Sequence, residues 1–100
     1  MITAQALRGI DRVRHAFFTR EGGVSEGAFA SLNCGYGAGD DPERVASNRT
    51  RAMARLGREG GDLATLYQVH SADVVVVERS WPKGQAPHAD AQVTRTPGVA

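Results

Sequence analysis

The sequence predicts an α+β fold. Three observations support this: one amphipathic segment flanked by helix-capping residues, several short segments rich in β-branched and aromatic residues, and glycine-containing turns between them. We expect strands near residues 13–20, 65–70, 73–78 and 89–95, and a helix near residues 42–56. A chain of 100 residues with 41% hydrophobic content is long enough for one small domain, and a second domain is not expected.

The first predicted strand, "VRHAFFTR", ends at "EGG", which is typical of a strand that enters a tight turn. A loop follows over residues 22–41, and its length and glycine content favour a functional loop over a spacer. At its start, Arg20 and the amides of Gly22 and Gly23 could bind an anion. The alternative is an ordinary hairpin turn beside an exposed arginine.

The predicted helix has clear signals at both ends. Asp41 can cap its first turn, Pro42 suits its first position, and Gly57 can end it in a left-handed conformation. Asn48 and Arg49 fall at the same angular position as the apolar face, so they need polar partners unless Arg49 reaches water along the edge of that face. The apolar face comprises Val45, Ala52, Met53 and Leu56.

The second half of the chain contains the other three predicted strands. "TLYQVH" would place Leu66, Gln68 and His70 on one face of a strand. The continuous apolar run in "VVVVE" predicts burial on both faces of the next strand. "ADAQVTRT" predicts a third strand, which ends at "PG".

Charge and cysteine content narrow the classes of partner. The 12 basic and 11 acidic residues are interspersed and give a net charge of +1, so we expect neither nucleic-acid nor membrane binding. A small neutral or anionic ligand fits better. A single cysteine excludes an internal disulfide framework, and no apolar segment reaches the length of a signal peptide or a membrane span. Cytoplasmic localisation is the default expectation.

His70 is the main candidate functional residue, and the residues alone leave three roles open. It could be a satisfied structural histidine, a general acid or base, or a metal ligand. His15 and His88 have no further ligand at metal-binding spacing, so structural or surface roles are expected for both. A nucleophile pair of Cys34 with His70 is conceivable, but no spacing in the sequence brings the two together.

Several motifs together resemble the bacterial YfiH family, known as laccase-like polyphenol oxidases and as purine nucleoside phosphorylases. The stretches are "HAFFTREGGVSEGAFASLNCGYGAGDDPERVASNR", "QVHSADVVVV" and "ADAQVTRTPGVA", which cover nearly all of residues 15–100. The resemblance implies a single mixed-sheet domain with flanking helices. It also implies that residues 1–100 are the N-terminal portion of one such catalytic domain, incomplete at its C-terminal end.

The resemblance also implies a site. In the family the histidine that corresponds to His70 is one of three zinc ligands, and a downstream cysteine and histidine complete the set; Cys34 is not that cysteine. The implied substrates are phosphate and the nucleosides adenosine, inosine and methylthioadenosine, with adenosine deamination as a second reaction. Zinc would activate water for deamination. His70 is therefore expected to be a catalytic and metal-binding residue, and Arg20, Asn33 and Gln68 are expected to bind substrate.

Two other functions remain open at this point. One is copper-dependent oxidation of phenols, although the sequence contains no closely spaced pair of histidines. The other is a non-catalytic binding module, in which the polar residues on strand faces are structural.

Overall fold

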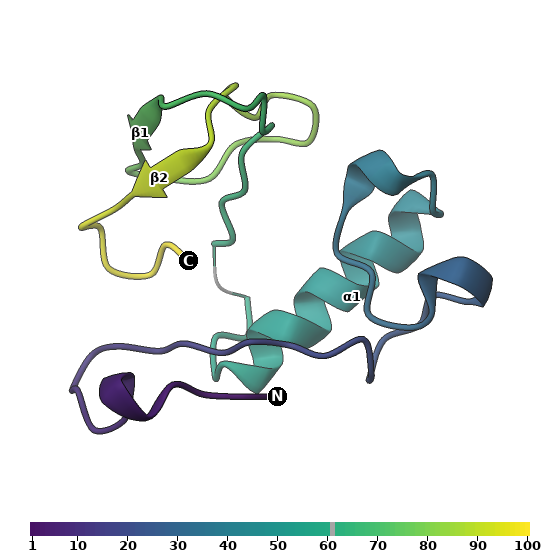
Figure 1. Ribbon diagram of the computed structural model, residues 1–100, viewed down its shortest axis with the longest axis horizontal. Coiled ribbons are helices and arrows are strands. Elements are labelled where there is room, and N and C mark those ends of the chain that lie inside the picture. The colour runs from purple at the N-terminus through teal and green to yellow at the C-terminus, as the bar shows by residue number, and fades with distance from the viewer. Residues whose placement is uncertain (61) are drawn as a thin grey trace. The chain divides into compact units, whose positions relative to one another are not determined.

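The computed structural model describes residues 1–60 and 62–100. They form two compact units, Met1–Gly60 and Gly61–Ala100, in an α+β arrangement (Figure 1). The first unit contains the helix α1 (Pro42–Arg55) and short 3-10 helices at Gln5–Leu7, Gly27–Phe29 and Tyr36–Ala38. The second contains the strands β1 (Val74–Val76) and β2 (Ala91–Val93). That residues 1–100 belong to one catalytic domain stays a prediction.

Helix α1 begins and ends as predicted, because both of its caps form. The Asp41 carboxylate accepts the Glu43 N–H at 2.9 Å, and Pro42 occupies the first turn. At the other end Leu56 is the cap, and Gly57 has a φ of +70°. The Gly57 and Arg58 amides then bond back to the carbonyls of Ala54 and Met53, which is the Schellman arrangement.

The apolar face of α1 supplies the core of the first unit. Val45, Ala52 and Met53 are buried, whereas Leu56 is half-buried at the helix end. Asn48 lies among them with an exposed fraction of 0%. The buried face therefore combines apolar contacts with one polar side chain, as its angular position in the sequence indicated.

The strand predicted over residues 13–20 was wrong. Within residues 1–60 this segment makes one antiparallel bridge, in which Phe17 and Ile2 exchange backbone hydrogen bonds of 2.7 and 2.8 Å. The ladder stops there because the chain after Ile2 turns into the 3-10 helix Gln5–Leu7 and offers no extended partner. His15 has a structural contact, since its Nε2 accepts the Ala4 N–H at 2.8 Å.

Strands β1 and β2 lie at the predicted places but are shorter than predicted. They pair in parallel, with Val74 opposite Ala91 and Val76 opposite Val93 (Figure 1). The expected burial of the valine run on both faces was wrong, because Val74 and Val76 are 62% and 70% exposed while Val77 is 3% exposed. Within the described residues this two-stranded sheet has one packed face, so alternate valines point to solvent.

The strand predicted over residues 65–70 was also wrong. Tyr67 forms one parallel bridge with His88, and their rings stack with centroids 4.6 Å apart. Beyond Tyr67, the Val69 and His70 amides bond to the side chain of Asp90 instead of a neighbouring strand. A ladder cannot continue where a carboxylate takes up its donors.

No helix in the described part of the chain is both long and apolar enough to cross a membrane.

Candidate functional site

His70 lies at the tip of a turn in the second unit. Its backbone has a φ of +61°, in the left-handed region that non-glycine residues seldom adopt. Its side chain is exposed, and within residues 62–100 the imidazole nitrogens have no hydrogen-bond partner. The structure thus presents an imidazole with both nitrogens available, held on a backbone that costs about 1 kcal/mol or more to maintain.

The Asp90 carboxylate holds this turn. Its Oδ1 accepts the amides of Val69 and Ser71 at 3.0 and 2.8 Å and the Ser71 hydroxyl at 3.0 Å. Its Oδ2 accepts the His70 amide at 3.1 Å. Hydrogen bonds from the backbone of Ser71, then of Val69, lower the pKa of Asp90 below its usual value, so the carboxylate is ionised at neutral pH.

Reciprocal contacts fix Asp90 itself. The amides of Asp90 and Ala91 both bond to the Asp73 carbonyl at 3.3 Å, and the Asp73 amide bonds to the Ser71 hydroxyl at 3.3 Å. Ala91 then begins β2, and Ala89 on the other side is fully buried. The "VHSAD" and "DA" segments are therefore joined by reciprocal hydrogen bonds just before β1 and β2 begin.

Gln68 is exposed beside this turn. Gln68 and His70 were expected on one face because side chains alternate along an extended strand. His70 has a positive φ, so the segment is not an extended strand there and the alternation does not hold. A role for Gln68 in substrate binding stays a prediction.

Arg20 and the two glycines after it shape a loop in the first unit. Arg20 Nε donates to the Ala30 carbonyl at 3.0 Å, and the Arg20 carbonyl accepts the Ser31 amide at 2.8 Å. A Cβ on Gly22 would lie 1.8 Å from an Arg55 side-chain nitrogen, and one on Gly23 would lie 2.0 Å from the Ser31 carbonyl oxygen. Close packing against backbone therefore requires Gly23. Gly22 is favoured by its φ of +94°, because the end of the Arg55 side chain could move aside.

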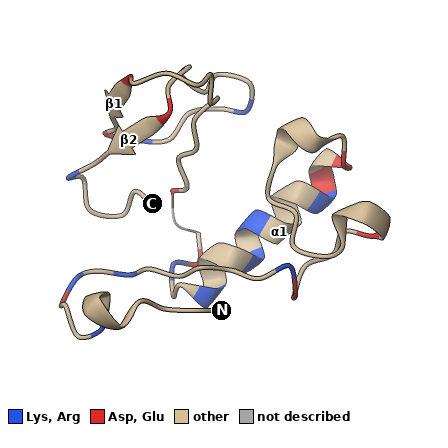
Figure 2. Cartoon of the chain, viewed as in Figure 1, with Lys and Arg blue, Asp and Glu red and all other residues tan. Residues whose placement is uncertain are grey.

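The glycine amides contribute less to an anion site than the sequence suggested, because the Gly23 amide donates to Ser31 Oγ at 3.2 Å. The exposed Arg20 guanidinium keeps its terminal nitrogens available. Basic positions also line the later part of α1 (Figure 2), where Arg51 and Arg55 donate to the carbonyls of Gly22 and Glu21. A role for Arg20 in binding phosphate stays a prediction.

A buried polar network ties the loop to α1, and Asn33 belongs to it. Asn48 Nδ2 donates to Ser25 Oγ and to the Asn33 carbonyl, both at 2.8 Å, while its Oδ1 accepts the Val24 amide at 2.8 Å. Asp40 Oδ2 accepts the Ser25 hydroxyl at 2.5 Å and Asn33 Nδ2 at 3.2 Å. The Ser25 bond is the main reason that the pKa of Asp40 is lowered. The Asn33 side chain is thus engaged within its own loop, and its expected contact with substrate stays a prediction.

Arg49 is the second polar residue that ties α1 to the loop. Its Nε donates to the Cys34 carbonyl at 2.8 Å, and its guanidinium lies 4.4 Å from the centre of the Tyr36 ring. Burial raises the pKa of the Cys34 thiol, and the nearby Arg49 charge opposes this. A thiol with a raised pKa is a poor nucleophile at neutral pH, which gives no support to a pair with His70.

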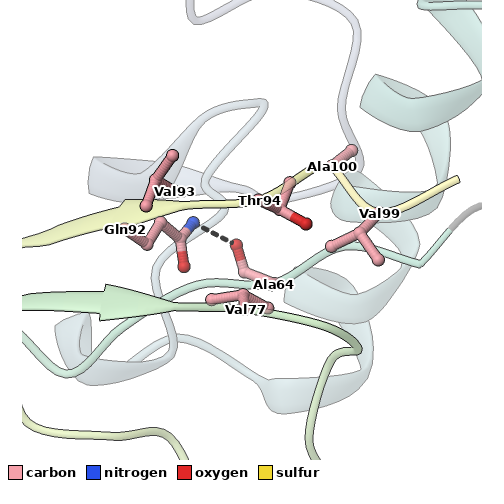
Figure 3. A pocket seen from close by; sticks show the side chains of 7 residues that line it. All are labelled: Ala64, Val77, Gln92, Val93, Thr94, Val99 and Ala100. Atoms are coloured by element: carbon pink, nitrogen blue, oxygen red, sulfur yellow. Dashed lines mark hydrogen bonds between the residues drawn. The ribbon is translucent and has the colours of Figure 1, made fainter. Parts of the chain in front are cut away.

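The second unit also contains a small pocket, of about 190 Å³ (Figure 3). In Figure 3, Gln92 Nε2 donates to the Ala64 carbonyl at 2.8 Å across the lining. No lining residue is titratable, and ligand pockets usually begin at roughly 300 Å³. We therefore do not assign a nucleoside to this pocket. Its lining residues are Ala64, Val77, Gln92, Val93, Thr94, Val99 and Ala100.

A complete metal centre is not formed by the described residues, among which no group of three His, Cys, Asp or Glu side chains could hold an ion. The donor chemistry of His70 nevertheless suits a metal, since an exposed imidazole with available nitrogens is a common zinc ligand. The chemistry of His70 therefore suits one metal ligand, and the described residues do not supply a further two beside it.

These features define an α+β protein that presents one exposed histidine on a turn hydrogen-bonded to the Asp90 carboxylate. The chain belongs to the family described as multi-copper polyphenol oxidoreductase laccase, whose model matches residues 14–100. It is 44% identical over 89 residues to a purine nucleoside phosphorylase of Corynebacterium glutamicum, covering 88% of this chain and 36% of that protein. It is 49% identical over 90 residues to a purine nucleoside phosphorylase of Deinococcus radiodurans, covering 87% and 32%.

Two solved structures are similar to this chain in both fold and sequence. YlmD from Geobacillus stearothermophilus matches with a TM-score of 0.70 at 33% identity, covering 80% of this chain and 32% of YlmD. A DUF152 protein of Neisseria meningitidis matches with a TM-score of 0.67 at 42% identity, covering 80% and 31%. The chain spans about a third of the length of the curated relatives that it matches.

Proposed function

We propose that this chain is part of a zinc-dependent purine nucleoside phosphorylase that acts on adenosine, inosine and methylthioadenosine, with adenosine deaminase activity. The observation that carries the proposal is the exposed imidazole of His70 on a hydrogen-bonded turn, in a chain whose relatives are named purine nucleoside phosphorylases. The substrates are purine nucleosides and phosphate, neither nucleic acid nor membrane is a partner, and the compartment is the cytoplasm.

His70 is proposed as the residue of this segment that binds zinc. Its partners would be a cysteine and a histidine outside the described residues, because three protein ligands and one open position are what a catalytic zinc requires. Bound zinc supplies Lewis-acid chemistry for deamination. The contribution of this chain is to orient His70, which the hydrogen bonds between the turn and the Asp90 carboxylate favour.

Arg20 is proposed to bind phosphate for phosphorolysis. The reaction needs an anion held beside the anomeric carbon of the ribose while the bond to the base breaks. Arg20 is anchored through Nε to Ala30, which leaves the two terminal nitrogens of its guanidinium for a bidentate contact. Gln68 would orient the nucleoside. Asn33 would contribute a polar contact from its loop.

Copper-dependent oxidation of phenols is the alternative enzyme function, and the description of the matching family favours it. The histidines of this chain weigh against it, since His15 accepts a backbone amide and His88 stacks on Tyr67. A multicopper site needs several imidazoles directed at the metals. A non-catalytic binding module is the remaining alternative.

Metal content and turnover of the full-length protein test the proposal. We expect about one zinc ion per chain and phosphate-dependent cleavage of inosine. Several copper ions per chain with phenol oxidation would establish the alternative enzyme. Neither metal and neither activity would leave the binding module.

A further inference from the structure

We propose that Asp90 is a positioning residue for His70: its carboxylate fixes the backbone of residues 69–71, and this backbone presents the imidazole to the metal. The inference rests on the proposed function, in which His70 binds zinc. It adds a residue that no feature of the sequence identified, because Asp90 is twenty positions away in the chain and bonds to backbone amides.

The two carboxylate oxygens of Asp90 have different tasks. Oδ1 accepts two amides and one hydroxyl from Val69 and Ser71, the neighbours of His70. Oδ2 accepts the amide of His70 itself, at 3.1 Å. Together they satisfy three consecutive backbone donors that would otherwise pair with a strand or with water.

These bonds select the backbone conformation of His70. A histidine at a φ of +61° has lower-energy alternatives in the β and right-handed regions, so an outside constraint has to favour the observed state. Rotation of φ into either alternative would redirect the Cβ and therefore the imidazole. Metal ligands have to be held within about 0.5 Å of their productive positions, so such a change would weaken binding.

Asp90 is suited to this role because it is itself immobilised. Its amide bonds to the Asp73 carbonyl, and its neighbours are the buried Ala89 and the first residue of β2, Ala91. Asp90 therefore links the turn at residues 69–71 to the start of β2.

The chain provides two matched controls. Asp62 accepts the Ser80 amide at 2.9 Å and the Ser80 hydroxyl, so Asp62→Asn weakens a similar carboxylate contact in a turn without His70. Asp73 is exposed, and within residues 62–100 its carboxylate makes no hydrogen bond to the turn, so Asp73→Asn removes a nearby negative charge while keeping the backbone bonds.

The experiment uses the full-length protein with Asp90→Ala, Asp90→Asn and both controls. Two quantities are measured: amide hydrogen exchange at residues 69–71 in the metal-free protein, and zinc affinity by competition with a chelator. Asp90→Asn can keep the Oδ1 bonds, but it replaces Oδ2 with an amide NH2 group, which cannot accept a hydrogen bond from the His70 N–H. It therefore separates the His70 bond from the other three.

We expect Asp90→Ala to accelerate exchange at all three amides by at least about tenfold and to weaken zinc binding by about 10- to 100-fold. Asp90→Asn should accelerate exchange mainly at His70 and weaken zinc binding by an intermediate factor. Asp62→Asn and Asp73→Asn should leave zinc affinity within about twofold of wild type, even if Asp62→Asn lowers the melting temperature.

Unchanged zinc affinity in Asp90→Ala, with zinc still bound through His70, would overturn the positioning role. If His70→Gln retains all of its zinc, the proposed function fails instead. The exchange data then decide the inference alone: unchanged exchange at residues 69–71 in Asp90→Ala overturns it, and accelerated exchange supports the conformational part.

Discussion

The Asn48 network and the Asp90 turn both use one polar side chain to hold a distant segment of the chain, but the first is buried and the second lies beside an exposed histidine. In each, one polar side chain satisfies groups from a segment distant in sequence. Asn48 is fully buried, and the side chains around it are engaged with one another. Asp90 bonds to backbone, and the side chain of His70 is left exposed. The first arrangement stabilises a fold, whereas the second makes a functional group available.

The largest expected effect comes from Asn48→Ala. The change leaves the Val24 amide, Ser25 Oγ and the Asn33 carbonyl without their partner in a buried site, so we expect a loss of about 3 kcal/mol in unfolding free energy. Chemical denaturation of the full-length protein measures it. Gln68→Ala, at an exposed position, should cost under about 0.5 kcal/mol. If Asn48→Ala and Gln68→Ala lowered the unfolding free energy by equally small amounts, the Asn48 network would not stabilise the fold.

Truncations along α1 test how the apolar face contributes. Met53 is 5% exposed, and Met53→Ala should cost about 2 to 5 kcal/mol through lost burial and a residual cavity. Leu56 is half-buried at the helix cap, so Leu56→Ala should cost less, below about 2 kcal/mol. A larger loss at Leu56 than at Met53, measured in the same denaturant series, would contradict this order.

Arg20→Ala tests whether the first region also binds an anion. We expect the KM for phosphate in nucleoside cleavage to rise about tenfold, which corresponds to about 1.4 kcal/mol. Zinc content and deamination should be largely spared, because only phosphorolysis uses phosphate. Arg14→Ala removes an exposed charge from the same unit and should change none of these quantities. Equal damage to both reactions by Arg20→Ala would indicate a folding role.

The smallest expected effect is a pH dependence. Hydrogen bonds, first from Ser25, hold the pKa of Asp40 below its ordinary value of about 3.9. The folded state therefore gains stability above that value and loses it as the pH falls through the lowered pKa of the folded state. Asp62 and Asp90 act in the same direction. Asp40→Asn should flatten the acid side of a plot of unfolding free energy against pH, and an unchanged slope would contradict the assignment.

The sequence predicted helix α1 well because its signals are local. A capping aspartate, a proline at the first turn and a glycine after the last turn act within a few residues, and the structure uses all three. The strands near 13–20 and 65–70 had suitable composition, but a strand also needs a partner. Ile2 and the Asp90 carboxylate, which are remote in sequence, decided how those backbones pair.

The candidate site shows the same limit. His70 was identifiable because imidazole chemistry is visible in the sequence, and the odd position of Asn48 on an apolar face indicated that it needed partners. Neither observation revealed which residues those partners would be. Asp90 was read as the beginning of a strand, since a carboxylate that accepts backbone amides twenty residues away leaves no periodic pattern.

Zinc stoichiometry of His70→Gln in the full-length protein tests the central claim most directly. Glutamine keeps a polar side chain of similar reach but is a much poorer zinc ligand. Because the imidazole makes no hydrogen bond within residues 62–100, we expect a folded protein whose melting temperature is close to that of metal-free wild type, with lowered zinc occupancy and little phosphorolysis or deamination. Full zinc occupancy with normal turnover per folded molecule would contradict the account.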